Sequence, residues 1–361
     1  MSNFNYHYFW NDVDIVEAKK KVSKIGKLNC ASNELIHHDL ACINDDMIKV
    51  LDVNLNNCYI YYPDKMVKFS KLLQIPPENL QLFSGSDDAI KIVLTALGIN
   101  CENIIIQSPN YENYYCYARL NGYKIVQWNM DDTYHFAVSK GIELLEQIGV
   151  SIVILTTPNG FTGFTMTLED ITSIIEVAYS KNSIVVIDQA YAPFAKINYI
   201  KFALKYDNVI VISTLSKGLG LAGARLAYTC TCTNIASYLT KWNGINSVSA
   251  LSYEIGEYYL SCKSLDKIIN DILQERNEFI DFINTKTPWI AYPSKANFVL
   301  INLGSEKIAI GLSDYFNEND IIVRRLTINP FKNCVRITIV DHDKMQKIKA
   351  VIIKYAAGRS H

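Results

Sequence analysis

Short runs of β-branched residues alternate with longer amphipathic segments through the first half of this chain. The apolar runs are residues 103–106, 124–126, 151–155 and 183–187, with amphipathic segments such as residues 168–180 between them. Parallel strands that are buried on both faces are continuously apolar, and helical crossovers connect them. The alternation therefore predicts an α/β fold in which helices cover both faces of a mostly parallel sheet.

The last third of the chain has a different pattern. Residues 251–285 contain an apolar stripe and no proline, which predicts one long or lightly broken helix. Beyond it we expect strands at residues 297–301, 321–323 and 335–339, and helices at residues 308–316 and 341–356. The chain is thus expected to have three parts: an N-terminal arm and segment that packs on the small domain (residues 1–40), a large domain (residues 41–255) and a small α+β domain (residues 256–361).

The composition excludes several classes of protein. The chain has 361 residues, 49% of them hydrophobic, which argues against a disordered or fibrous protein. Its formal net charge is -1 and no long basic run is present, so we expect neither nucleic acid nor a membrane as partner. The sequence shows neither a secretion signal at its start nor an apolar segment of membrane-spanning length, which predicts a cytoplasmic protein.

The cysteines and histidines indicate neither disulfides nor a metal. The nine cysteines are scattered, odd in number and in several cases placed within apolar runs, as at residues 228–232. This favours reduced core thiols over a disulfide framework. The six histidines have no ligand-like spacing to cysteines or carboxylates, so we expect no metal site.

One lysine follows an apolar strand in a turn of small and hydroxyl residues. Lys217 comes after the predicted strand of residues 209–212, in the segment Ser-Thr-Leu-Ser-Lys-Gly. Burial lowers the pKa of a lysine amine, which allows it to form a Schiff base with a carbonyl. The hydroxyls of Thr214 and Ser216 and the guanidinium of Arg225 suit a phosphate on the same ligand. The alternative is an ordinary surface lysine in a loop.

A carboxylate and a phenol follow another predicted strand. Asp188 ends the strand of residues 183–187, and Tyr191 comes three residues later. In an open α/β sheet, ligands bind at the carboxyl ends of the strands. If Lys217 holds a pyridoxal group, such a carboxylate pairs with the ring nitrogen and the phenol with the ring oxygen. The alternative is a helix N-cap at Asp188 and a core position for Tyr191.

Three further segments carry suitable groups at predicted strand ends. Ser86 and Asp87 open a helix after a glycine turn, which is either an anion site or a plain helix cap. Tyr111 follows the strand of residues 103–107 and can stack on a flat ring or pack in the core. Asn159 offers an amide after the strand of residues 151–155. Together these groups predict one ligand site at the carboxyl edge of the sheet.

These segments, in this order, resemble the fold type I pyridoxal-phosphate enzymes of the class I/II aminotransferase type, and within them the histidinol-phosphate aminotransferase family, across nearly the whole chain. The resemblance implies a seven-stranded, mostly parallel sheet between helices, a small α+β C-terminal domain and pyridoxal 5'-phosphate as cofactor. The segment Tyr62-Pro63-Asp64 is similar to a family segment whose tyrosine reaches the cofactor phosphate of the neighbouring subunit. This implies an obligate homodimer with shared active sites.

The resemblance also implies a role for each matched residue. Lys217 would hold the cofactor and move a proton, and Arg324 and Arg336 would bind the anionic end of the substrate. The retained segment Ser32-Asn33-Glu34 places Asn33 and Glu34 among the substrate residues. The implied cofactor residues are Ser86, Asp87, Tyr111, Asn159, Asp188, Tyr191, Thr214, Ser216, Lys217, Arg225 and, from the partner subunit, the equivalent of Tyr62.

The chain departs from the family pattern at the loop after residue 155. Gly160 replaces the family's second asparagine, which usually bonds the cofactor's ring oxygen. Either Asn159 takes over this contact or Tyr191 holds the oxygen alone. Gln189 replaces the usual glutamate, and the segment after Glu34 lacks the family's proline-rich continuation. The substrate is therefore left open.

Three interpretations of the function follow. The first is a transaminase that moves an amino group between a donor such as glutamate and a small phosphate-bearing carbonyl compound, either of the histidinol-phosphate type or a smaller amino-alcohol phosphate. The second is a decarboxylase of a phosphorylated amino acid, because pocket geometry rather than motif separates the two reactions. The third is a catalytically silent binding protein, which the intact Lys217, Asp188 and Arg225 disfavour.

Overall fold

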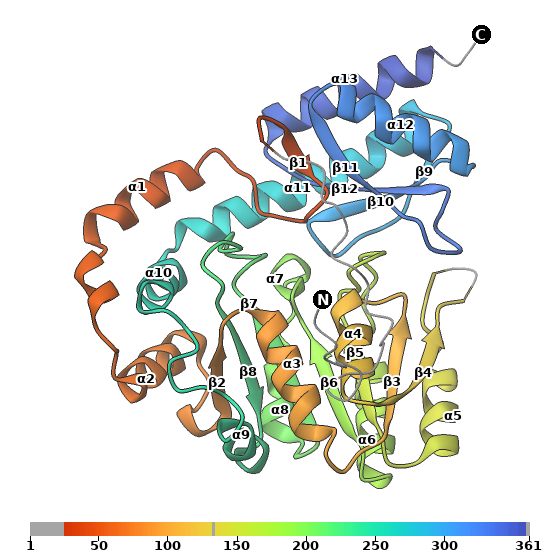
Figure 1. Ribbon diagram of the computed structural model, residues 1–361. Helices are drawn as coiled ribbons and strands as arrows, with labels where there is room; N and C mark the ends of the chain where they lie inside the picture. Colours follow the sequence, from red (N-terminus) through yellow and green to blue (C-terminus); the bar gives the residue numbers. More distant parts are fainter. Residues whose placement is uncertain (1–24, 132–133, 359–361) are drawn as a thin grey trace, which may run out of the picture.

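The computed structural model describes residues 25–131 and 134–358, which form two β-sheets with helices around each (Figure 1). Residues 1–24 of the expected N-terminal arm lie outside the described residues. None of the helices in the described part is long and apolar enough to cross a membrane.

The larger sheet has seven strands in the order β2-β8-β7-β6-β5-β3-β4. These are β2 (Leu80–Phe83), β3 (Asn103–Ser108), β4 (Lys124–Asn129), β5 (Ile152–Thr156), β6 (Ile184–Asp188), β7 (Val209–Thr214) and β8 (Ala227–Thr231). Within the sheet, β8 runs antiparallel to both of its neighbours and the remaining pairs are parallel. The predicted helix-covered, mostly parallel seven-stranded sheet is confirmed.

Both faces of this sheet are buried, because successive residues of a strand point to opposite sides. In β5, Ile152 and Ile154 pack in one apolar cluster, whereas Val153 and Leu155 pack in another. The first cluster lies under α3 (Ser86–Leu97), α4 (Glu112–Leu120) and α9 (Thr233–Thr240). The second lies under α5 (Val138–Ile148), α6 (Leu168–Ser180), α7 (Ala192–Ala195) and α8 (Ile200–Lys205).

The smaller sheet has the strand order β1-β11-β12-β10-β9. Its strands are β1 (Leu28–Cys30), β9 (Ile290–Ala291), β10 (Phe298–Asn302), β11 (Ile321–Arg325) and β12 (Cys334–Thr338), and its helices include α12 (Glu306–Glu318) and α13 (His342–Ala357). The parallel pairing of β1 with β11 attaches a strand from the start of the described chain to a sheet built from its end. The exact domain boundaries stay a prediction.

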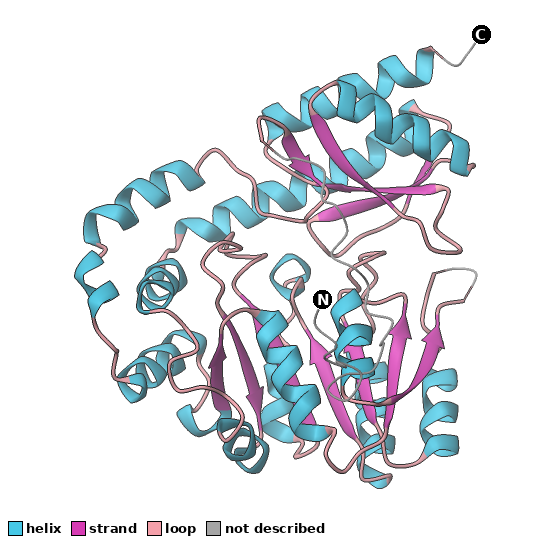
Figure 2. Ribbon diagram, in the orientation of Figure 1, coloured by secondary structure: helices cyan, strands magenta, loops and turns pink. Residues whose placement is uncertain are grey.

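The remaining helices lie along one side of the molecule (Figures 1 and 2). They are α1 (Leu40–Val50), the short 3-10 helices η2 (Val53–Asn57) and η3 (Pro77–Asn79), α2 (Tyr62–Leu73), α10 (Ala250–Ser261) and α11 (Ser264–Lys286). The segment predicted as one long or lightly broken helix is thus two helices, with an extended backbone at Cys262 between them. The break lets α10 pack beside α2 while α11 runs on under the smaller sheet (Figure 1).

Candidate functional site

The carboxyl ends of the parallel strands meet at the edge of the seven-stranded sheet that faces the smaller sheet (Figure 1). The register places Thr156 opposite Asp188, and Thr214 opposite Ala227 at the start of β8. The loops that carry the predicted site residues therefore leave the sheet at one edge. Residues 31–34 lie between the two sheets, since this segment bonds to side chains from both of them.

Lys217 lies in the turn after β7. It is half-buried, and its Nζ donates a hydrogen bond of 2.9 Å to the carbonyl oxygen of Ser32. The turn depends on the glycine that follows the lysine, because a Cβ at Gly218 would lie 2.6 Å from side-chain carbons of Pro193. The fold thus holds the lysine amine at the sheet edge, next to residues 31–34.

Asp188, at the end of β6, is a buried carboxylate in this edge. Its Oδ1 accepts a hydrogen bond of 3.0 Å from the backbone N–H of Ala190, and its Oδ2 accepts one of 3.0 Å from the hydroxyl of Tyr114. Burial nevertheless raises the pKa of Asp188 to about 6. A cation beside this carboxylate would favour its ionised form, so the position suits a ligand with a protonated ring nitrogen.

Tyr114 is absent from the residues predicted from the sequence. It is fully buried on α4, and burial together with the charge of Asp188 raises the pKa of its hydroxyl, which stays protonated and donates to the carboxylate. The chain has 23 tyrosines, so residue type carries little information. The one usable signal is position, since Tyr114 comes three residues after Tyr111 and shares its side of the helix.

A glycine turn and a guanidinium form the expected phosphate side of the site. The guanidinium of Arg225 lies close over Gly85. A Cβ added to this glycine would be 2.4 Å from Arg225 Nη2. Gly85 also has a φ of +86°, a conformation that favours glycine. Ser86 begins α3 beside this turn, and the hydroxyls of Thr214 and Ser216 are 2.9 Å apart at the end of β7. Helix N–H groups, hydroxyls and a guanidinium are the usual donors to a phosphate.

Asp87 connects the phosphate side to the expected ring-stacking residue. Its Oδ1 accepts hydrogen bonds of 2.8 Å from the Tyr111 hydroxyl and from Asn113 Nδ2, and its Oδ2 lies 3.4 Å from Arg225 Nη2. The carboxylate of Asp87 therefore orients Tyr111 and Arg225. A phosphate would meet the backbone N–H of Asp87 in the first turn of α3, which is the contact that the family resemblance implies.

Asn159 is fully buried in the loop after β5. Its Nδ2 donates to the carbonyl oxygen of Pro109 over 3.1 Å, and its Oδ1 accepts from the backbone N–H groups of Phe161 and Thr162 over 2.9 and 3.2 Å. Both ends of this amide thus hold the loop in shape. The sequence left two alternatives for the bond to the cofactor's ring oxygen, Asn159 or Tyr191. This geometry disfavours Asn159, because its amide is already bonded at both ends.

Tyr191 is joined to the smaller sheet through Asn33. The Tyr191 hydroxyl accepts a hydrogen bond of 2.8 Å from Asn33 Nδ2, and the backbone N–H of Asn33 donates to Thr338 Oγ1 over 3.1 Å. Glu34 accepts a hydrogen bond of 3.1 Å from Asn29 in β1. The structure thus brings Asn33 to Tyr191, one of the predicted cofactor residues. The hydrogen bond of Glu34 instead joins it to a strand of the smaller sheet.

Arg324 and Arg336 are register partners on the neighbouring strands β11 and β12. Arg336 donates to the carbonyl oxygens of Gly160 and, over 3.2 Å, of Ala31, and its guanidinium lies 4.9 Å from the centre of the Phe298 ring. Burial, with the nearby charge of Arg324, lowers the pKa of Arg336 to about 10, so the Arg336 guanidinium is a cation at neutral pH. Two guanidinium groups side by side favour an anion at this place.

Tyr62 is the predicted residue that the structure of one chain does not bring to the site. It begins α2, and its hydroxyl is buried within its own chain. Its contact with the cofactor phosphate of a neighbouring subunit stays a prediction.

Comparisons with known proteins identify the family. The sequence matches the family "Aminotransferase class I and II" over residues 55–352. The histidinol-phosphate aminotransferase of Clostridium kluyveri is 30% identical over 306 residues, which make up 83% of this chain and 84% of that protein.

Two solved structures show the same fold at low identity. The histidinol-phosphate aminotransferase of Sinorhizobium meliloti, in complex with pyridoxal-5'-phosphate, has a TM-score of 0.80 at 18% identity and covers 92% of this chain and 91% of its own. The L-threonine-O-3-phosphate decarboxylase of Porphyromonas gingivalis has a TM-score of 0.77 at 16% identity and covers 91% of this chain and 99% of its own. The fold is therefore common to enzymes of both reactions, whereas the sequence match is to one family. The chain belongs to the class I and II aminotransferases.

Proposed function

We propose that this aminotransferase binds pyridoxal 5'-phosphate at the carboxyl edge of its seven-stranded sheet and holds it through Lys217. One observation carries the proposal: the Lys217 amine, the buried Asp188 carboxylate and the Arg225 guanidinium over Gly85 all lie on this edge. The amine suits the carbonyl of that cofactor, the carboxylate suits its ring nitrogen, and the guanidinium suits its phosphate.

Each residue has a distinct task in this proposal. When bound, pyridoxal phosphate supplies a carbonyl that condenses with amines and a ring that accepts electrons. Asp188 holds a proton on the ring nitrogen, because Ala190 and Tyr114 orient both of its oxygens. The Nζ of Lys217 is the base that removes a proton from the substrate's α-carbon and returns one. Tyr111, oriented by Asp87, stacks on the ring.

We propose that the substrates are an amino acid donor such as glutamate and a small phosphate-bearing carbonyl compound as acceptor. Arg324 and Arg336 support an anionic group on the substrate, because they are register partners and Arg336 lies between the sheets. Asn33 and Glu34 are proposed to lie beside it. The acceptor is the carbonyl compound whose amination gives histidinol phosphate, as the name of the relative from Clostridium kluyveri indicates, or one whose amination gives a smaller amino-alcohol phosphate.

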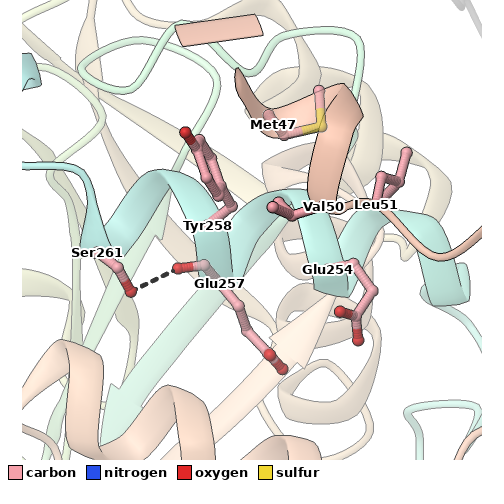
Figure 3. A pocket seen from close by; sticks show the side chains of 7 residues that line it. All are labelled: Met47, Val50, Leu51, Glu254, Glu257, Tyr258 and Ser261. Atoms are coloured by element: carbon pink, nitrogen blue, oxygen red, sulfur yellow. Dashed lines mark hydrogen bonds between the residues drawn. The ribbon is translucent and has the colours of Figure 1, made fainter. Parts of the chain in front are cut away.

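An exposed apolar face supports a homodimer with shared active sites. Val50, Val53 and Tyr61 lie on or beside α1, η2 and α2 and are between 62% and 69% exposed. A pocket between α1 and α10 adjoins this face and is lined by Met47, Val50, Leu51, Glu254, Glu257, Tyr258 and Ser261 (Figure 3). Apolar surface gathered in this way is typical of an interface. A second copy of the chain is the proposed occupant, because Tyr62 begins the adjoining α2.

We propose the cytoplasm as the compartment of this enzyme. All nine cysteines are unpaired thiols in the structure, and Cys42 and Cys58 are exposed. Exposed free thiols are the usual state in a reducing compartment. Fractionation of cells that express the tagged protein tests this.

Absorbance of the purified protein tests the cofactor. After incubation with pyridoxal phosphate, the chain should acquire the yellow absorbance of a Schiff base, and Lys217→Ala should abolish it. Lys196→Ala is the matched control, since Lys196 is exposed and bonds to Asn270 over 2.8 Å. If the unaltered chain stays colourless, the proposal fails and a silent binding protein is the remaining interpretation.

The reaction products separate transamination from decarboxylation. Glutamate should bleach the yellow absorbance and yield 2-oxoglutarate without CO2, and a phosphorylated aldehyde or ketone should then restore the colour. The decarboxylase is kept as a second candidate, because the Porphyromonas gingivalis enzyme shares the fold. Release of CO2 from a phosphorylated amino acid, with no bleaching by glutamate, would favour it.

A further inference from the structure

One buried donor at the carboxyl edge of the sheet has no partner in the part of the chain that the structure describes. The Nδ2 of Asn110 makes no hydrogen bond with any described residue, although the side chain is only 3% exposed. Buried polar groups are nearly always paired, with protein, water or a ligand. An unpaired buried amide next to a proposed ligand site therefore points to a ligand atom that accepts a hydrogen bond.

The orientation of this amide follows from its other bonds. The Oδ1 of Asn110 accepts hydrogen bonds of 2.7 Å from the backbone N–H of Tyr111 and of 2.7 Å from Thr156 Oγ1. A backbone N–H only donates, so the atom that faces it is the amide oxygen. The nitrogen is therefore the free end.

The same bonds place Asn110 within the site. Tyr111 is the proposed ring-stacking residue, and Thr156 is the register partner of Asp188. The preceding residue, Pro109, accepts the hydrogen bond of Asn159. Asn110 thus lies between the strand ends that carry the buried carboxylate and the aromatic side chain.

We propose that Asn110 Nδ2 donates a hydrogen bond to the ring oxygen of bound pyridoxal phosphate, an inference that rests on the proposed function. The ring oxygen is an acceptor, and other amides near it are engaged. Asn159 Nδ2 donates to Pro109, and Asn33 Nδ2 donates to the Tyr191 hydroxyl. Asn110 is then a cofactor-binding residue, and Tyr191 is the second donor to the same oxygen.

Removal of this donor should change how the bound cofactor titrates. A hydrogen bond from Asn110 would stabilise the deprotonated ring oxygen, so without this donor the bound cofactor would lose its proton at a higher pH. Asn110→Ala should therefore raise the pH midpoint of the absorbance change by about one unit and weaken cofactor binding about tenfold. The titratable groups around the site are unchanged in this variant: Asp87, Tyr111, Tyr114, Asp188, Tyr191, Lys217 and Arg225.

A second substitution, at position 160, tests whether Asn110 binds the cofactor or only supports the local structure. A Cβ at Gly160 would lie 3.5 Å from the Tyr191 ring, an ordinary contact, so the backbone accepts a side chain at this position. Added to Asn110→Ala, Gly160→Asn should return the midpoint toward its original value, because it supplies an amide beside Tyr191. It restores no bond to Thr156 or to the N–H of Tyr111, so a structural role of Asn110 predicts no rescue.

The outcomes are decisive in either direction. A raised midpoint that Gly160→Asn reverses supports the inference, whereas an unchanged midpoint, or a shift without rescue, overturns it. If Asn110→Ala does not fold, Asn110→Val serves the same measurement, because valine also lacks a donor and fills more of the side chain's volume. If the unaltered chain never becomes yellow, the proposed function fails instead, so the two failures are distinguishable.

Discussion

At the scale of single residues, the site contains buried polar groups whose burial lowers the stability of the folded protein when no ligand is bound. Burial opposes the charge of Asp188 more strongly than the hydrogen bonds from Ala190 and Tyr114 favour it. The Nδ2 of Asn110 is buried and has no hydrogen-bond partner within residues 25–131 and 134–358. A ligand that supplies a cation and an acceptor relieves both, so ligand binding and stability are coupled at this edge.

We predict that Asp188→Asn stabilises the cofactor-free protein at pH 8. The folded pKa of about 6 is above the ordinary value of 3.8, so Asp188 makes the unaltered chain lose stability as pH rises through this window. Asparagine carries no charge, so the gain should be about 3 kcal/mol at pH 8 and near zero at pH 4 in urea unfolding. A difference that does not depend on pH would contradict this explanation.

Gly85→Ala is predicted to fold but to bind pyridoxal phosphate at least about tenfold more weakly. The new Cβ would lie 2.4 Å from Arg225 Nη2 and would displace the guanidinium. The positive φ adds strain. Gly223→Ala is the control, because a Cβ there meets nothing within 4 Å. Equal dissociation constants for the two variants, measured by absorbance titration, would argue against a phosphate at Arg225.

At the scale of elements, residues 31–34 connect the two sheets. The carbonyl of Ser32 accepts from Lys217, and Asn33 bonds to Tyr191 in one layer and to Thr338 in the other. The side chain of Asn297 in the smaller layer also donates to the Asn33 carbonyl, over 3.1 Å. This segment therefore fixes the smaller sheet over the proposed active site.

Thr338→Val should lower the free energy of unfolding by about 1–3 kcal/mol, because it leaves the buried N–H of Asn33 without its acceptor. Thr229→Val is the matched control in β8. The hydroxyl of Thr229 is buried and has no hydrogen-bond partner among the described residues, so this substitution should be neutral or stabilising. Urea unfolding of both variants checks the pair, and similar losses would show that the Asn33 bond contributes nothing particular.

At the scale of the whole molecule, the proposed homodimer depends on the face around α1. Val50→Asp should dissociate it, because Val50 is 68% exposed within the apolar group and a buried carboxylate at an interface is unfavourable. Val150→Asp is the control, since Val150 is 51% exposed before β5, away from this face. Sedimentation measures the mass, and a Val50→Asp protein that remains a dimer would place the interface elsewhere.

The sequence predicts the elements with strong local patterns. Helix α6 occupies the expected residues 168–180, and β3, β5, β6 and β7 coincide with apolar runs, because local hydrophobic periodicity is enough to specify them. Strand β1 was not predicted. It has three residues, and its partner β11 is almost 300 positions away, so no local signal marks the pairing.

The sequence by itself determined the fold class, the family and the residue types of the proposed cofactor site, since strand periodicity and motifs are local properties of the chain. Only the tertiary structure decided which polar atoms are occupied and which remain free. It showed that the Asn159 amide bonds to its own loop and to the loop after β3, that Tyr114 supports Asp188 and that Asn110 Nδ2 has no partner among the described residues. The physical reason is that a hydrogen-bond partner depends on distance in space, which residues far apart in sequence acquire only on folding.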